Sequence, residues 1–367
     1  MKAGRRTLLA WCWLPVCLAW VAGPRQARAA QDEIRLLGPG NKVFRGEVKR
    51  ESLERVVVLD EHGAPGPEFR GDQIAEIVWD IPKGEWRMGL AEMSRGNYEM
   101  AAVYFRGLLD DLGSFRDAAR PYLLLMYAMS LYRWGKSAEA AEELERLTRE
   151  YPASRYVPEA IDRMVEIHIQ TKNYNKAQAL LKKLSGLGPR YAVRAVLHEA
   201  ELDLAQGRPD EASKKFARAA GETSDAQTRA IIQLGQARCA VAQQQLGKAA
   251  QMAAQALAGG PPPSVAATAH LILGTVMLEE ARNSKDDPVK HLDAALEFLR
   301  VVYLYPGEEG TEPEALFKAG ECFRLLSKLP GRKAEMGRAA ELYRMAQNKY
   351  PGSRWAKAAG EQLKLVR

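Results

Sequence analysis

The sequence contains few cysteines. Only four occur in 367 residues, and two of them, Cys12 and Cys17, lie near the amino terminus. The other two, Cys239 and Cys322, fall far apart in different predicted helices. Small secreted proteins that lack a core depend on several disulfides, so this composition excludes that class. The fold must be stabilised by packing of hydrophobic residues, which make up 47% of the chain.

The sequence also lacks the patterns that mark catalytic and metal sites. It contains no G-x-S-x-G, no P-loop, no H-E-x-x-H and no Cys-x-x-Cys. No histidine stands three or four residues from another histidine or a cysteine, the spacing that places two metal ligands on one helix face. We therefore expect no catalytic, cofactor or metal site, and a protein that is not an enzyme. The five histidines are His62, His168, His198, His270 and His291.

The first 29 residues have the pattern of a secretion signal. Lys2, Arg5 and Arg6 precede an apolar run at 8–21, and Ala27-Arg28-Ala29 has the small-x-small form of a signal peptidase site. We expect cleavage after Ala29 and an exported protein of the periplasm or cell envelope. A membrane anchor is the alternative, but the run is about 14 residues and spanning a bilayer takes ~20. The paired arginines leave general and twin-arginine export both open.

The formal charge of +7 and the pI of about 9.1 are typical of proteins with anionic partners. Most of the excess lies in the leader, which holds five Lys and Arg residues and no acid. Removing these five from 53 leaves 48 basic residues against 46 acidic ones, a charge of +2. The mature chain therefore gives little reason to expect a nucleic-acid partner.

Residues 31–82 alternate with a period of two, which predicts strands. Phe44 and Val48 share one face, and Arg45, Glu47 and Lys49 take the other. The stretches 42–48, 56–59 and 72–77 resemble the small Sm-like or SH3-like barrels at the start of some bacterial envelope proteins. Some barrels of that type bind RNA, so nucleic-acid or anionic-polymer binding through this module is the alternative function. The predicted strands are 34–37, 43–49, 55–59, 68–70 and 74–79.

From residue 83 onward the pattern is that of helices joined by short turns. Small residues followed four positions later by a larger one recur every 35 to 45 residues, as in Ala140/Leu144 and Ala294/Phe298. These units resemble tetratricopeptide repeats, in which two small positions let the helices of a hairpin approach closely. The first of those positions holds Gly89, Ala128, Val165, Ala200, Ala237, Gly274 and Gly320.

The resemblance implies a mainly α fold: a tetratricopeptide-like α-solenoid of about seven helical hairpins over 83–352, preceded by a small β-barrel-like module. A closing helix is expected at 353–367, where lysines face outward as the end of a solenoid requires. The Tyr-Pro-x-Ser turns at 151–154 and 350–353 resemble those of envelope tetratricopeptide proteins. The run Gly259-Gly260-Pro261-Pro262-Pro263 is either a hinge between repeats or a rigid turn.

In the resembled family the first helices line a concave face that binds partner proteins. Carrying those positions over residue by residue implies a partner-binding surface of Trp86, Tyr122, Met129, Tyr132, Arg133, Asp162 and Glu166, with Arg194 and Glu201 in the next repeat. An aromatic and methionine surface followed by mixed charge suits a peptide or helix. The alternative is that Trp86 packs under the strand module and Tyr132 belongs to the core. We expect an exported, non-enzymatic scaffold for protein or peptide partners, with no small-molecule substrate.

Overall fold

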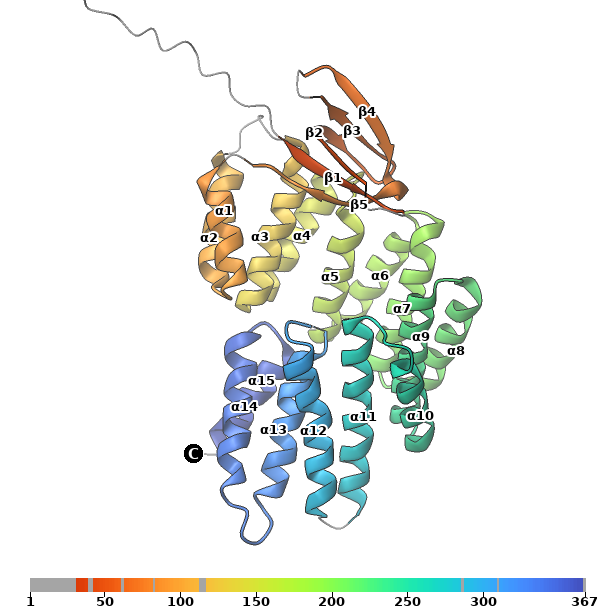
Figure 1. Ribbon diagram of the computed structural model, residues 1–367, viewed down its shortest axis with the longest axis vertical. Helices are drawn as coiled ribbons and strands as arrows, with labels where there is room; N and C mark the ends of the chain where they lie inside the picture. Colours follow the sequence, from red (N-terminus) through yellow and green to blue (C-terminus); the bar gives the residue numbers. More distant parts are fainter. Residues whose placement is uncertain are drawn as a thin grey trace, which may run out of the picture.

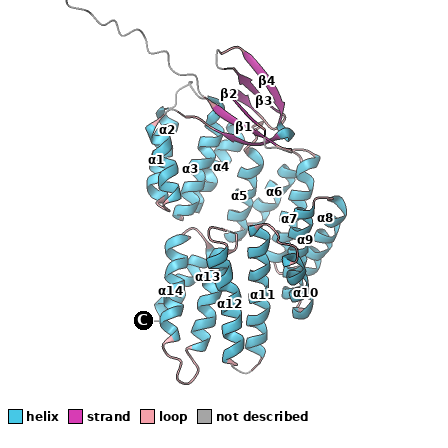
Figure 2. Ribbon diagram, viewed as in Figure 1, coloured by secondary structure: helices cyan, strands magenta, loops and turns pink. Residues whose placement is uncertain are grey.

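The computed structural model describes residues 31–38, 42–60, 63–81, 83–111, 117–284, 287–308 and 310–365. A small β-sheet module lies against the amino-terminal part of a long helical array (Figure 1; Figure 2). The predicted signal peptide, residues 1–29, lies outside the described residues.

Five strands form one antiparallel sheet in the order β4-β3-β2-β1-β5. The predicted strands are confirmed, but β4 and β5 are edges within the described residues, so the sheet is open and does not close into a barrel. Pro65 and Pro67 in β4 lack the N–H donors that a further ladder needs, and proline is confined to such edges. The strands are β1 (Asp32–Leu36), β2 (Val43–Glu51), β3 (Arg55–Leu59), β4 (Pro65–Arg70) and β5 (Ile74–Val78).

Fifteen α-helices follow in the described part of the chain, as seven consecutive pairs and a final single helix. Each packs chiefly on the helices before and after it, which is the arrangement of a solenoid (Figure 2). None of the described helices is both long and apolar enough to span a bilayer. The helices are α1 (Gly84–Ser94), α2 (Tyr98–Asp111), α3 (Arg120–Trp134), α4 (Ser137–Glu150), α5 (Val157–Gln170), α6 (Tyr174–Ser185), α7 (Pro189–Ala205), α8 (Pro209–Glu222), α9 (Ala226–Ala242), α10 (Leu246–Leu257), α11 (Pro263–Asn283), α12 (Pro288–Leu304), α13 (Glu312–Leu326), α14 (Glu335–Lys349) and α15 (Arg354–Leu365).

Helix α4 shows how the sequence specifies a hairpin. Ala140, Leu144 and Leu147 recur at helical spacing, and all three are fully buried. Ser137, a residue type that often caps helices, does not cap this one, because the helix already begins there and Lys136 occupies the N-cap position without a capping hydrogen bond. The apolar stripe, rather than the cap, therefore specifies this helix.

Close approach within three hairpins depends on glycine. A Cβ at Gly89, Gly274 or Gly320 would lie 2.5 to 2.8 Å from the ring of the aromatic residue on the second helix. The predicted small positions thus allow the approach, and the aromatic residue fills the space inside its own hairpin. The pairs are Gly89 with Phe105, Gly274 with Phe298, and Gly320 with Tyr343.

An aromatic cluster joins the sheet module to the array. Trp79, which follows β5, donates a hydrogen bond from Nε1 to the Tyr156 hydroxyl at 2.7 Å in a buried setting. The Tyr122 ring of α3 lies 6.5 Å from Trp79, 5.9 Å from Trp86 and 5.1 Å from Tyr156. Burial raises the pKa of Tyr122. The cluster therefore fixes the module on α1, α3 and α5.

A buried carboxylate makes the second joint. Glu51 in β2 accepts hydrogen bonds from the Ser154 hydroxyl at 2.6 Å and from the Arg155 backbone N–H at 2.9 Å. Burial raises the pKa of Glu51, although both hydrogen bonds lower it in part. Leu53 N–H also donates to the Ala153 carbonyl at 2.8 Å. The turn between α4 and α5 is thereby tied to the sheet.

The helical array curves until its last turn meets an early one. A Cβ added at Gly352 would lie 2.0 Å from the Tyr132 carbonyl oxygen, and one added at Gly135 would lie 3.4 Å from Pro351. The turn before α15 thus packs on the carboxyl end of α3, and Figure 1 places α13–α15 beneath α1–α3. The repeats form a closed ring whose inner helices face one another across a central space.

Candidate functional site

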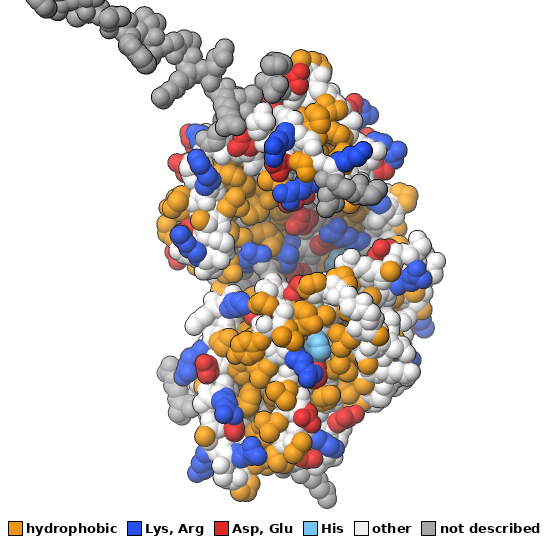
Figure 3. Space-filling model, viewed as in Figure 1, with side chains coloured by type: hydrophobic (Ala, Val, Ile, Leu, Met, Phe, Trp, Pro, Cys, Tyr) orange, Lys and Arg blue, Asp and Glu red, His pale blue; other side chains and the backbone are white. Residues whose placement is uncertain are grey.

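The inner side of the ring encloses a cavity of about 1420 Å³. Figure 3 shows it as a hollow between the two halves of the molecule, with acidic and basic side chains inside. Most of its lining comes from α5 and α7, with contributions from the carboxyl end of α3, from α9, from the start of α13 and from the sheet edge at Asp72 and Ile74. The site is therefore assembled from segments spread over the whole chain.

The lining is charged and nearly balanced. It includes seven carboxylates and six guanidinium groups. Helix periodicity explains this, because α5 and α7 bury one apolar stripe against their neighbours and turn the opposite stripe toward the cavity. The carboxylates are Asp72, Glu159, Asp162, Glu166, Glu201, Glu308 and Glu314, and the arginines are Arg155, Arg163, Arg190, Arg194, Arg238 and Arg354.

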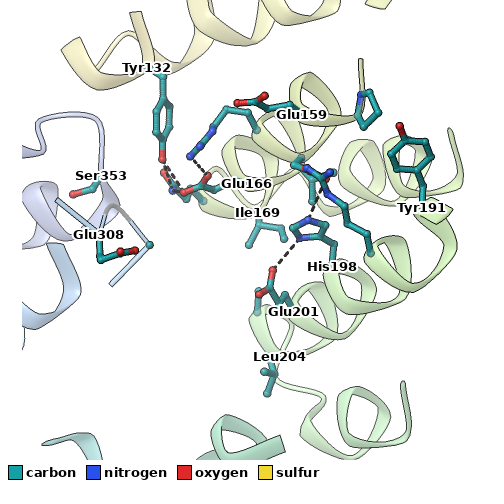
Figure 4. Close-up of a pocket in the computed structure, with 18 of the residues that line it drawn as sticks. Tyr132, Glu159, Glu166, Ile169, Tyr191, His198, Glu201, Leu204, Glu308 and Ser353 are labelled. Carbon is teal, nitrogen blue, oxygen red and sulfur yellow. Dashed lines mark hydrogen bonds and ion pairs between the residues drawn. The ribbon is translucent and has the colours of Figure 1, made fainter. Parts of the chain in front are cut away.

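Tyr132 connects α3 to α5 at the cavity wall (Figure 4). Its hydroxyl donates to Glu166 Oε1 at 3.0 Å and accepts from Gln170 Nε2 at 3.0 Å. Arg163 pairs with Glu166 at 2.8 Å and lies 5.6 Å from the centre of the Tyr132 ring. Burial, together with the Glu166 charge, raises the pKa of Tyr132. The phenol therefore stays protonated and acts as a fixed hydrogen-bond donor.

A second chain of polar contacts joins α5, α7 and α9. Asp162 forms an ion pair with Arg194, and its carboxylate lies 3.1 Å from His198 Nε2. His198 Nδ1 lies 3.1 Å from Glu201, which in turn lies 3.9 Å from Arg238. Burial alone would raise the pKa of Glu201, but the hydrogen bond from His198 and the positive charges of His198 and Arg238 hold it below its usual value. The wall thus presents pre-positioned charges of both signs.

Two arginines connect the cavity to the sheet module. Arg155 donates from Nη2 to the Ile74 carbonyl at 3.1 Å. Arg190 donates to the Leu53 carbonyl at 3.4 Å, and its guanidinium lies 4.6 Å from the centre of the Tyr191 ring. The Nη1 atom of Arg155 is buried and has no hydrogen-bond partner among the described residues. A buried donor without a partner costs stability at this joint between the cavity wall and the sheet module.

The structure brings three of the seven predicted partner-binding residues together at the cavity. These are Tyr132, Asp162 and Glu166. Arg133 instead lies near the ring-closing contact beside Lys349, with its guanidinium 5.8 Å from the centre of the Tyr98 ring.

The other three predicted residues do not line the cavity. Trp86 at 6% exposed and Met129 at 7% exposed are core residues that do not reach the cavity, whereas Tyr132, also a core residue at 7% exposed, reaches its wall. Tyr122 packs in the aromatic cluster under the sheet. The family positions do not line an open groove at Trp86 and Tyr122, because these side chains pack in the aromatic cluster beneath the sheet module, and Met129 is buried in the core.

Several cavity residues were missed. Glu159 and His198 lie on the same helix faces as predicted positions, so reading the whole face of each helix would have found them. Arg238 directly follows the small residue Ala237, as Glu166 follows Val165, so carrying the family positions over to this repeat would have predicted it. Glu314 stands six residues before Gly320, as Glu159 stands before Val165, so the repeat pattern also marks it, whereas Glu308 lies in the turn before α13 and carries no such signal.

Much of the positive charge on the described part of the sheet is paired. Four of its arginines are each paired with a carboxylate of the module at 2.5 to 2.8 Å, which neutralises their charge toward a phosphate backbone. Among the described residues, no group of three or more His, Cys, Asp or Glu is arranged to hold a metal ion. The four ion pairs are Arg35 with Glu76, Arg45 with Glu33, Arg55 with Glu68, and Arg70 with Asp72.

Comparison with known families agrees with this geometry. The tetratricopeptide repeat model matches residues 122–154 and 314–353, which include most of α3 with α4 and most of α13 with α14. This chain contains tetratricopeptide repeats. The two matched segments are those that meet where the ring closes. Such repeats indicate a role as a scaffold for interactions between proteins.

Solved structures that resemble this repeat protein share little sequence with it. A tetratricopeptide repeat protein from Parabacteroides merdae has a TM-score of 0.47 and 12% identity, with 77% of this chain and 97% of that chain covered. PilF from Pseudomonas aeruginosa has a TM-score of 0.38 and 19% identity, with 61% and 91% covered. The carboxyl-terminal part of a repeat protein from Cytophaga hutchinsonii has a TM-score of 0.36 and 12% identity, with 75% and 98% covered. No curated protein matches the sequence.

Proposed function

We propose that this repeat protein is an exported, non-enzymatic scaffold of the cell envelope that binds an extended peptide segment of a partner protein in its central cavity. The observation that carries the proposal is the cavity itself, at about 1420 Å³ and lined by seven carboxylates and six guanidinium groups. Sites for small molecules usually enclose roughly 300–1,000 Å³ and are mostly apolar. This larger polar space suits a peptide better than a metabolite.

The chemistry of the lining sets the kind of peptide. Because the two signs of charge are nearly equal, a partner segment of mixed charge fits better than a polyanion. Arg238 lines the cavity with a side chain that is 45% exposed, and its guanidinium provides donors for a backbone carbonyl or carboxylate of that segment. Asp162 and Glu201 are engaged in ion pairs with neighbouring cations, which suits recognition more than proton transfer.

Reversing a single cavity charge tests the binding proposal. Glu159 is exposed in the cavity lining on α5, so Glu159→Lys is expected to weaken crosslinked capture of partners from envelope extracts by roughly 10-fold without lowering the melting temperature. Glu142→Lys on α4 makes the same charge change at an exposed site outside the cavity and serves as the control. Equal capture by both variants would contradict the cavity proposal.

Export is tested separately at the amino terminus. Expression of the full chain in a bacterial host is expected to give a periplasmic protein that begins at Ala30, because Ala27-Arg28-Ala29 has the form of a cleavage site. Amino-terminal sequencing or intact mass measures this directly. Recovery of the uncleaved chain in the cytoplasm would contradict the export proposal and leave the binding proposal intact.

A further inference from the structure

Helix α12 carries an apolar stripe that no part of the described chain covers. Of the twelve large hydrophobic side chains exposed in the described residues, four lie on this one helix. Figure 3 shows hydrophobic side chains gathered over the half of the molecule where Figure 1 places α11–α13. The four side chains and their exposed fractions are Val289 at 61%, Leu296 at 54%, Tyr303 at 66% and Leu304 at 62%.

The stripe has the spacing of a coiled-coil seam. Val289, Leu296 and Tyr303 recur every seven residues, and the half-buried Leu292 and Leu299 fall between them. This alternation of three and four residues places all five side chains along one line of the helix, where they can interlock with a second helix. Helix α12 already packs one apolar face, which includes Phe298, into the core of its own chain. A helix on the outer surface needs no second apolar face for folding.

The charges beside the stripe point to its occupant. Asp293 and Arg300 are exposed and occupy equivalent positions one heptad apart on the same side of the stripe, and Arg300 also forms an ion pair with Glu297 of its own helix. When two copies of this helix pack antiparallel about a two-fold axis near Leu296, Asp293 of each copy faces Arg300 of the other. The corresponding positions on the other side are Ala295 and Val302, which are buried in the chain's own core, so a parallel pairing has no such charge partners.

We propose that this protein forms a homodimer through an antiparallel pairing of α12, with Leu296 at the centre of the interface. The surface is self-complementary in both its apolar line and its charges, which is what an isologous interface requires. The pairing leaves the central cavity untouched, because α12 contributes no residue to the cavity lining. The dimer therefore presents two peptide sites, and it does not depend on what those sites bind.

The expected dimer is weak. A helix of 17 residues is about 25 Å long, and one helix pair of that length buries less than the roughly 1,200–2,000 Å² of a standard stable interface. We therefore expect a dissociation constant on the order of 10–100 μM.

Sedimentation equilibrium of the full chain over a concentration series tests the proposal. The wild-type mass is expected to rise from the monomer value toward twice that value as concentration increases. Leu296→Glu is expected to raise the dissociation constant roughly 30-fold or more, with an unchanged melting temperature, because the side chain is exposed in the monomer. Val103→Glu on α2 is the matched control, being 56% exposed outside the stripe, and is expected to leave the dimer intact.

Reversing one charge tests the antiparallel arrangement. Asp293→Arg is expected to weaken the dimer, because it faces Arg300 of the other copy, and Asp293→Asn, which adds no like charge, is expected to restore most of it. A chain that stays monomeric at every concentration overturns the proposal and leaves α12 as a surface for a different partner. A dimer that survives Leu296→Glu, or an Asp293→Asn variant that is weakened as much as Asp293→Arg, overturns the assigned interface.

Discussion

Replacing Gly320 by valine is expected to lower the free energy of unfolding by about 3 kcal/mol, because the core has no space for a side chain there. A Cβ at this position would lie 2.5 Å from the ring of Tyr343, which is itself fully buried and donates its hydroxyl proton to Glu321. The ring cannot move aside without breaking that hydrogen bond. Urea denaturation followed by circular dichroism measures the loss.

Gly107→Val is the matched control for this change. Gly107 also lies inside a helix, α2, but a Cβ there meets nothing within 4 Å. The free energy of unfolding is expected to change by less than about 0.5 kcal/mol, since valine and glycine differ little in helix propensity. Similar losses in the two variants would show that the close approach of α13 and α14 does not depend on Gly320.

Glu51→Ala is expected to lower the free energy of unfolding by about 3 kcal/mol and to loosen the sheet module from the array. The change removes the acceptor for two buried donors, the Ser154 hydroxyl and the Arg155 backbone N–H, and each unsatisfied donor costs about 1–3 kcal/mol. Hydrogen exchange is expected to accelerate at Arg155 and in β2, while α11–α15 keep their protection. Uniform acceleration along the whole chain would contradict a role in docking the module.

Two further variants separate the charge of Glu51 from its hydrogen bonds. Glu54→Ala removes an exposed carboxylate from the same segment and is expected to have little effect. Glu51→Gln keeps one acceptor and is expected to lose less stability than Glu51→Ala. Burial raises the pKa of Glu51 in the folded chain above its value in the unfolded chain. The contribution of Glu51 to stability therefore falls as the pH rises from the unfolded pKa to the folded pKa. Glu51→Gln is expected to remove this dependence of stability on pH.

Most of the fold could be predicted because its signals are local. The strands follow from alternation within a few residues, and the hairpins follow from stripes such as Ala140, Leu144 and Leu147. The small residues Gly89, Gly274 and Gly320 could also be predicted, because the repeat pattern places a small residue where the aromatic ring of the second helix packs. Only the closure of the sheet was mispredicted, because a resemblance to barrels does not determine whether β4 and β5 pair.

The site could be predicted only in part. Tyr132, Asp162 and Glu166 line the cavity because the family positions describe the inner face of each first helix correctly in the middle of the array. Trp86 and Met129, carried over from the same family positions, are buried in the core and do not reach the cavity. Periodicity identifies an apolar face but does not say what covers it.

The sequence by itself determined the class of fold, the order of strands and helices, and the small residues that set the spacing inside each hairpin. These depend on interactions between residues close in the chain, which periodicity records. Only the tertiary structure decided that the array closes, with Gly352 against the Tyr132 carbonyl, and that Glu314 and Arg238 therefore share a cavity with Asp162. The curvature of a solenoid is the sum of a small rotation at every repeat, so no local segment of sequence encodes whether its ends meet.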